Sequence, residues 1–403
     1  MKKTILAILL ALPLLLSAQQ KKTLPVWQEG YLDIHNVATA CGDCTFIKMP
    51  DGTTMLIDAG DMRGSSWNVR CLPDDSRTPA QWIARYISRV APGTETLDYV
   101  FLTHLHPDHC GNGRALRDSD HGYKVCGITE VGEYFKIGKM VDRGYPTYDL
   151  PSKEYCLNLN KAFFPHYLKF LERVSSEGGT VERFKVGSRG QFALLHDPAS
   201  YKGLYEVFNI AGNALKATVK GKAVKMYAPG DDVSKFDENM FSCAIRIRYG
   251  NFVYYNGGDL PGNNYGPKKR AAHNRDYESE IADLIGHANA VKADHHGWKD
   301  SCNPNFLWKV RPDVIVIQAS QERHPWVETA QRFCDPQYPG EMQLYITSDR
   351  SRKQLGEELY SKFHTPGHIV FRVYPGGENW QVFVLDANDP QNWIIEESEL
   401  KQL

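Results

Sequence analysis

After its first twenty residues the sequence contains no apolar run long enough to span a bilayer. It also has no excess of either charge, with 47 Lys and Arg against 48 Asp and Glu. A chain-wide surface for a polyanion is therefore not indicated, although a local basic groove stays open. Internal repeats, low-complexity tracts and evident linkers are absent too. With 403 residues, 42% of them hydrophobic, the chain is long enough to bury a large core.

The first residues follow the order of an export signal. Lys2 and Lys3 precede an apolar run over residues 5–16, and Ser17 and Ala18 supply small residues before a cleavage site. We therefore predict a signal peptide over residues 1–18 and a periplasmic or extracellular location. No Cys follows the apolar run, which argues against a lipid anchor at the cleavage site. The alternative to a signal peptide is a buried N-terminal helix.

The sequence contains nine cysteines, and all of them follow the predicted signal. Export permits disulfides, and an odd number leaves at least one thiol unpaired within a monomer. Cys41 and Cys44 have the spacing of a redox or zinc pair, but no second pair like it exists. Two small residues at a tight turn explain the same spacing, and the sequence does not choose the pairing.

Alternating and apolar runs predict many short strands. The expected strands cover residues 31–35, 45–49, 54–58, 97–102, 192–195, 223–226, 243–248, 252–255, 290–293, 314–317, 344–347, 368–373 and 380–385. The expected helices cover residues 80–90, 158–175, 277–287 and 326–333. Two runs of strands, each with helices, predict an α/β (α+β) chain folded as one sandwich of two sheets with helices outside. We place this domain at 25–390, with an elaboration near the site over 114–190 and a C-terminal tail over 391–403.

The strongest chemical signal is a cluster of histidines and one aspartate that directly follows the predicted strand at 97–102. His104, His106, Asp108 and His109 lie within six residues of one another. Neutral imidazole and carboxylate are ligands for zinc and similar divalent ions. A strand end followed by a sharp turn lets the first two imidazoles share one metal, while the last two side chains turn toward a second. A His-rich polar loop is the alternative.

Two further strands end in ligand-type residues. Asp259 follows two glycines after the strand at 252–255, and His295 and His296 follow the strand at 290–293. Glycines let the backbone approach a metal closely, and a carboxylate with two oxygens can bridge two cations. Each signal is weak alone, but rigid scaffolds present functional residues on the loops at strand ends. Three such ends together predict a metal site.

These motifs resemble the metallo-β-lactamase superfamily. They are most similar to the metallo-hydrolase domain of the bacterial competence (DNA-uptake) channel protein and its secreted free-standing relatives, from about residue 31 to 386. The stretch 36–60, with Gly42 and Asp43 at its turn, resembles the opening hairpins of that family. Other matching positions are Glu238, Asn239, Ser242, His324 and Pro325. The resemblance implies a four-layer αββα sandwich of two mixed sheets.

The resemblance also implies roles for the ligand residues. We expect His104 and His106 on the first metal, Asp108, His109 and His295 on the second, and Asp259 between the two. His296 or His324 would steady charge or protonate the leaving group, so the predicted catalytic residues are Asp108, His296 and His324. Asp58 is a candidate for orienting a ligand histidine. The expected cofactors are two divalent ions, zinc first, with manganese or iron as alternatives.

The chain departs from the family pattern at two positions. Many members have another histidine between the first motif and the Gly-Asp; His196 is the nearest candidate for this metal ligand, or it is a loop residue. Trp298 stands where relatives have a small polar residue, which puts their substrate contacts there in doubt. Asp276 and Glu278 are either acids behind the site or favourable charges at a helix start.

We predict a hydrolase of a phosphodiester or phosphate ester that uses water activated at the metals. Hydrolysis of a carboxylic ester, lactone or β-lactam is the second hypothesis, and a non-catalytic binding protein is the third. The expected partner is a small-molecule or nucleotide-like ester. Support for nucleic acid is one basic run at Lys268, Lys269 and Arg270, which a solvated loop also explains. The oligomeric state is not predicted.

Overall fold

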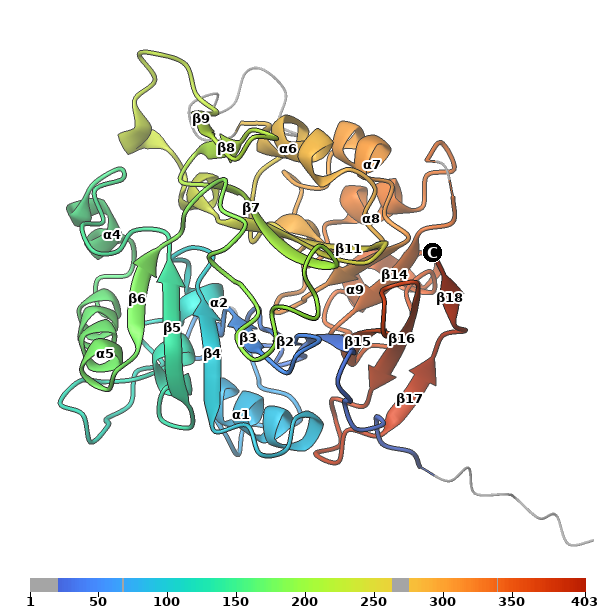
Figure 1. Cartoon of the computed structure of the whole chain (residues 1–403), viewed down its shortest axis with the longest axis horizontal. Helices are drawn as coiled ribbons and strands as arrows, with labels where there is room; N and C mark the ends of the chain where they lie inside the picture. Colours follow the sequence, from blue (N-terminus) through green and yellow to red (C-terminus); the bar gives the residue numbers. More distant parts are fainter. Residues whose placement is uncertain (1–20, 67–68, 263–274, 339) are drawn as a thin grey trace, which may run out of the picture.

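The computed structural model describes residues 21–66, 69–262, 275–338 and 340–403. The predicted signal peptide and the basic run at 268–270 lie outside the described residues. Two sheets face each other, with helices on the far side of each (Figure 1). This is the α/β sandwich with two mixed sheets that the sequence predicts.

The first sheet runs from the C-terminal strands through the N-terminal hairpins to the middle of the chain. Its order is β17 (Ile394–Glu397), β16 (Asn379–Leu385), β15 (His368–Val373), β1 (Leu32–Asn36), β2 (Thr45–Lys48), β3 (Thr54–Ile57), β4 (Thr96–Phe101), β5 (Lys136–Asp142) and β6 (Thr180–Arg183), and β18 (Lys401–Gln402) pairs with β16. Pairing is antiparallel from β17 to β3 and parallel from β3 to β6.

The second sheet repeats this mixed arrangement. Its order is β14 (Gln343–Ile346), β13 (Val314–Ile317), β12 (Ala290–Lys292), β11 (Phe252–Asn256), β10 (Ala244–Tyr249), β7 (Tyr205–Gly212), β8 (Leu215–Ala217) and β9 (Ala223–Lys225). Pairing is parallel from β14 to β11 and antiparallel from β11 to β9. Both sheets therefore contain parallel strands whose carboxyl ends present loops at one edge.

Helices cover the outer face of each sheet. The first sheet carries α1 (Pro79–Val90), α3 (Gly127–Val131) and α5 (Phe164–Ser176), and the second carries α6 (Tyr277–Ile285), α7 (Pro304–Val310), α8 (Val327–Phe333) and α9 (Arg352–Tyr360). Two short helices, α2 (Pro107–Cys110) and α4 (Lys153–Leu159), and three 3₁₀ turns, η1 (Val233–Lys235), η2 (Glu238–Phe241) and η3 (Asp294–Gly297), lie in loops. A separate apolar core lies between the sheets. The layers are thus helix, sheet, sheet and helix.

Local sequence explains the sharpest element boundaries. Thr78 caps α1 by accepting a hydrogen bond from the backbone of Gln81, whose side chain bonds back to Thr78. Pro79 fits the first helical turn, where no backbone donor is needed. β13 is a run of four buried β-branched residues, which suits a strand covered on both faces.

Two expectations differ from the structure. The helix expected over 158–175 is two helices, α4 and α5, and the second begins with Pro165 in its first turn. Residues 192–195 form no strand; Phe192 and Leu194 instead fill the core between the sheets. The stretch 114–190 contributes β5 and β6 to the first sheet, so it is part of the sandwich.

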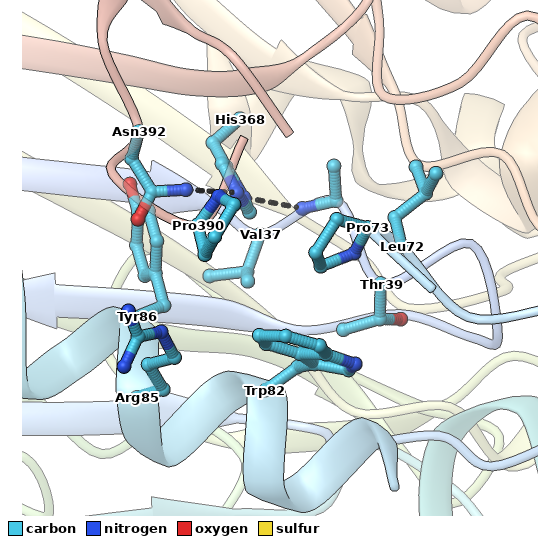
Figure 2. Close-up of a pocket in the computed structure, with 11 residues that line it drawn as sticks. Val37, Thr39, Leu72, Pro73, Trp82, Arg85, Tyr86, His368, Pro390 and Asn392 are labelled. Atoms are coloured by element: carbon cyan, nitrogen blue, oxygen red, sulfur yellow. Dashed lines mark hydrogen bonds between the residues drawn. The ribbon is translucent and has the colours of Figure 1, made fainter. Parts of the chain in front are cut away.

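The C-terminal tail is likewise structured, because β17 and β18 pair with β16. Among the helices of the described ranges, none has the length and apolarity that crossing a membrane would need. A small pocket lies between α1 and the loop after β16, lined by Trp82, Tyr86, His368 and Asn392 (Figure 2). Its volume of about 20 Å³ holds little more than one water, so it is too small for a substrate.

Candidate metal centre

The loops that follow three strands converge on Asp259. β4 leads to His104 and His106, β11 leads to Asp259 itself, and β12 leads to His296. Two groups of side chains could each hold a cation, and Asp259 belongs to both: His104, His106 and Asp259 form one, and Asp43, His109, Asp259 and His296 form the other. Within each group the ligand atoms lie within 4.8 Å of one another. The structure thus brings the three predicted chain segments together.

The first group suits one cation. The Nε2 atom of His104 lies 3.8 Å from Oδ2 of Asp259, and the rings of His104 and His106 are 4.9 Å apart. The His104 ring is fully buried, and its Nε2 atom makes no hydrogen bond. A buried polar atom without a partner is costly unless a ligand or ion satisfies it. The first group therefore fits the cation that the sequence predicts.

The second group is tighter and more deeply buried. The Nε2 atom of His109 lies 3.2 Å from Asp259 Oδ1, and the Nε2 atom of His296 lies 3.4 Å from Asp259 Oδ2. Neither Nε2 atom makes a hydrogen bond. Ligands about 2.0–2.1 Å from a tetrahedral zinc are roughly 3.3 Å from one another. The observed separations match that value.

The outer nitrogen of each buried ligand ring is held by the protein. The Nδ1 atom of His109 lies 2.8 Å from Asp58, and the Nδ1 atom of His296 lies 3.1 Å from the carbonyl oxygen of Gln318 and 2.9 Å from Asp43. Thr103 Oγ1 lies 3.1 Å from Nδ1 of His104. These contacts leave each Nε2 atom to face Asp259, which is the arrangement that orients histidines on metals. The predicted role of Asp58 agrees with its position.

A buried lysine lies among the acids of the centre. The ammonium of Lys292 is 2.7 Å from Asp43 Oδ2 and 3.5 Å from Asp259 Oδ1, and it donates a hydrogen bond to the carbonyl of Gly258. Burial lowers the pKa of Lys292, but Asp43 and Asp259 outweigh it and raise the pKa above the ordinary value. Lys292 therefore stays charged and partly neutralises Asp43.

Carboxylates dominate the electrostatics of the centre. Burial lowers the pKa of His109, yet the surrounding Asp259, Asp58 and Asp43 raise it to about 10. Burial raises the pKa of Asp259, while His109, His296 and Lys292 hold it well below its usual range. The site thus favours the ionised form of Asp259 and attracts positive charge, whether protons or metal cations.

Asp108 and His295 lie at the margin of the second group. Asp108 Oδ2 is 3.3 Å from Nε2 of His296. His295 Nε2 is 3.9 Å from Asp259 Oδ2, and its Nδ1 atom lies 2.7 Å from Asp300. The deeper position that we expected for His295 is occupied by His296. Both predicted ligands remain within reach of the centre.

The structure separates the two remaining candidates. The side chain of His196 is 54% exposed and lies 3.6 Å from Asp98, in the first half of β4, whereas the centre follows the last residue of that strand. His196 is absent from both groups of the described residues, and we do not assign it as a ligand. His324 is buried, and its ring stacks on His296 with centroids 4.2 Å apart. It therefore adjoins the centre, as predicted.

Close backbone approach explains the glycines around the centre. A Cβ atom on Gly42 or Gly60 would fall 2.4 Å or 1.9 Å from the carbonyl of Asp108, so only glycine lets the loop that carries Asp43 close over α2. A Cβ atom on Gly257 would meet Asp294 at 2.2 Å. The sequence predicts that Gly257 lets the backbone approach a metal. In the structure, the lack of a side chain at Gly257 leaves room for the carboxylate of Asp294.

Residues that precede β10 bind both halves of the centre. Glu238 accepts a hydrogen bond from the backbone of Leu105 and pairs with the buried Arg143. Asn239 donates to Nε2 of His295, and Ser242 accepts from the backbone of Asp259. These contacts fix the loops that carry the ligands.

Asp276 and Glu278, the two acids after the Gly-Asp motif, belong to neither group of possible metal ligands among the described residues. Asp276 caps α6 by accepting from the backbone of Ser279, as the helix-start alternative predicts. Glu278 is buried and accepts from the backbone of Cys302 and Asn303. It therefore supports the loop that follows His296.

Two residues of the centre were not predicted. Asp43 and Lys292 sit inside motifs that the sequence displays, but no local signal gives either a role. Only their mutual contact, across 249 positions of the chain, shows that they act together. Cys41, two residues before Asp43, is a free thiol, and its Sγ atom lies 3.2 Å from that of Cys71.

Residues 42–200 match the family model described as the metallo-beta-lactamase superfamily. This segment contains the first motif and one acid of the second group. The match covers less than half of the 403 residues and shows a similarity to that superfamily over this segment. No curated protein matches the sequence significantly.

Several solved structures resemble the chain at low identity. CmlA, a diiron β-hydroxylase from Streptomyces venezuelae, is 14% identical over 86% of this chain and 55% of its own, with a TM-score of 0.38. This chain thus spans about half the length of CmlA. A putative metal-dependent hydrolase from Parabacteroides distasonis is 10% identical over 78% and 92%, with a TM-score of 0.34. Zn²⁺-bound PqqB from Methylobacterium extorquens is 10% identical over 75% and 94%, with a TM-score of 0.33. We base no assignment of activity on likenesses this distant.

Proposed function

We propose that this chain, as a member of the metallo-β-lactamase superfamily, is a two-metal hydrolase of phosphodiesters or phosphate esters. The observation that carries the proposal is the set of three buried Nε2 atoms, on His104, His109 and His296, that face Asp259 without a hydrogen bond. Imidazole and carboxylate donors suit zinc, with manganese or iron as alternatives. The proposed location outside the cytoplasm rests on the predicted signal peptide alone.

His104, His106 and Asp259 would hold one cation, and His109, His296 and Asp259 the other, with Asp108 and His295 beside it. When bound, two divalent cations supply a water that ionises near neutral pH and a positive field on the substrate oxygens. Two-metal sites of this kind suit in-line displacement at phosphorus, because they stabilise both the attacking and the leaving oxygen.

The remaining groups of the centre position and balance these ligands. Asp58 holds the outer nitrogen of His109, and the carbonyl of Gln318, with Asp43 beside it, holds that of His296, so that both rings keep their Nε2 atoms near Asp259. Lys292 offsets the charge of Asp43. Burial and the neighbouring His296 lower the pKa of His324 well below the ordinary value. This ring is therefore neutral near pH 7 and a weak base, and stacking on His296 to hold that ring in place is the role its position supports.

The test uses the purified chain loaded with Zn²⁺ or Mn²⁺. We expect hydrolysis of bis-p-nitrophenyl phosphate, loss of activity with a chelator, and its return on adding metal. His104→Ala removes a ligand of the first group only, so it should abolish activity and lower the bound metal from about two ions to about one, whereas His196→Ala should retain both. Hydrolysis of a chromogenic cephalosporin or a carboxylic ester alone would replace the phosphoester assignment. Hydrolysis of neither class by the metal-loaded chain would favour a binding protein.

A further inference from the structure

Aromatic side chains continue from the metal centre toward the surface of the second half of the chain. The ring of His324 stacks on His296 at 4.2 Å, with an interplanar angle of 6°. Trp298 lies 6.0 Å from His324 and 6.0 Å from His295, and Trp326 lies 5.0 Å from Trp298. We call His324, Trp298 and Trp326 the aromatic wall. The wall begins at His324, which stacks on the ring of His296, and it ends at the two partly exposed indoles of Trp298 and Trp326.

Two cations flank the outer end of the wall. The ammonium of Lys299 lies 5.6 Å from the ring centroid of Trp326, and the guanidinium of Arg323 lies 5.5 Å from it. Arg323 is exposed. Cations beside an aromatic surface suit a ligand that combines a planar ring with negative charge, because the ring stacks while the charge pairs.

The backbone holds the wall in place. Trp326 donates its backbone N–H to the carbonyl of Gly297, and Thr329 donates its hydroxyl to the carbonyl of Trp298. A Cβ atom on Gly297 would lie 2.8 Å from Cβ of Pro325, so the two loops are in close contact. The indoles are therefore fixed relative to His296, and stacking on them would cost little ordering entropy.

We propose that the aromatic wall binds a planar aromatic ring of the substrate, so that the preferred substrate is a phosphoester carrying a nucleobase or a similar ring. This inference rests on the proposed phosphoesterase function. Trp298 and Trp326 are partly exposed next to the centre, so their indoles are accessible to a ligand. The wall gives a reason for an indole at the position where the resemblance predicts a small polar residue.

Two probes that differ only by a base test the proposal. Thymidine 5′-monophosphate and 2-deoxyribose 5-phosphate are titrated calorimetrically into the full metal-loaded chain. Base stacking on aromatic side chains predicts that the nucleotide binds roughly 5- to 100-fold tighter. Trp298→Ala and Trp326→Ala should each reduce this preference at least several-fold, while affinity for the sugar phosphate stays unchanged and shows that the variants fold.

Trp308 on α7 supplies the matched control, because it is 55% exposed and belongs to a helix on the outer face of the second sheet. Trp308→Ala should keep the full preference. Equal affinity of the unaltered chain for both probes would overturn the proposal, and so would an equal loss in the Trp308 variant. Failure of the underlying function is read separately, as absent hydrolysis of bis-p-nitrophenyl phosphate.

Discussion

The carboxylate of Asp58 accepts a hydrogen bond from Nδ1 of His109 over 2.8 Å, and both side chains are buried. This contact points the Nε2 atom of His109 at Asp259. Removing an acid that orients a metal-ligating histidine typically lowers metal affinity 10- to 100-fold. We expect Asp58→Ala to lower the affinity for Zn²⁺ by roughly that factor, measured by competition with a chromophoric chelator.

A surface pair of the same kind is the control for this experiment. Asp313 lies 3.2 Å from Nε2 of His287, and both side chains are substantially exposed. Asp313→Ala should leave zinc affinity unchanged. Unaltered affinity in the Asp58 variant would show that His109 does not depend on this carboxylate.

The ion pair between Arg143 and Glu238 should matter for stability. Both side chains are fully buried, with two N–O separations of 2.6 Å. Arg143→Met leaves the carboxylate of Glu238 buried without its cation, which typically costs about 3–5 kcal/mol. We expect a fall of that size in the free energy of unfolding, measured by urea titration of the metal-loaded chain.

The double variant Arg143→Met/Glu238→Gln removes both charges and should lose less stability than the single variant. The exposed pair of Arg352 and Glu357 provides the comparison, and Arg352→Met should leave stability nearly unchanged. If Arg143→Met were no more harmful than Arg352→Met, the buried pair would not support the fold.

His368 should make stability depend on pH. Its Nδ1 atom accepts a hydrogen bond from the backbone of Ala38, and its ring lies 4.3 Å from that of Tyr86 (Figure 2). Burial, and to a smaller extent the nearby His35, lowers the pKa of His368 to about 3. Between that value and an unfolded pKa of about 6.5, only the unfolded chain binds a proton at this ring. Stability is therefore complete above the unfolded pKa and falls as pH drops.

At pH 5 this linkage costs about 2 kcal/mol relative to pH 7. His368→Gln cannot titrate, so its free energy of unfolding should fall less between the two pH values. Urea titrations of both proteins at pH 7 and pH 5 measure the difference. An identical pH dependence would mean that the imidazole of His368 is protonated inside the fold.

Sequence patterns predict the helices and strands that are encoded by a short, continuous stretch of residues. The strands predicted over 314–317 and 368–373 have those bounds, because each is a short apolar run between polar loops. β5, by contrast, reads KIGKMVD, with two lysines, a glycine and no clean alternation, so the sequence pattern does not predict it. The helix predicted over 158–175 is interrupted between Leu159 and Phe164, and α5 begins anew with Pro165 in its first turn, where proline fits.

The same distinction holds for the centre. His104, His106 and His109 could be predicted because they lie together in the chain. The contact between Asp43 and Lys292 depends on the packing of one sheet against the other, which no spacing encodes. A single histidine between two motifs also gives no information about where it will lie relative to the strand ends. His196 lies near Asp98, in the first half of β4, whereas the centre follows the last residue of that strand.

Both sheets supply ligands: loops of the first carry His104, His106 and His109, and loops of the second carry Asp259 and His296. Neither half holds a complete coordination shell for either cation. During synthesis the pocket for metal cannot close until the second half has emerged and docked. Cation uptake would thereby come late in maturation, and a metal bound at Asp259 would link the two halves of the chain.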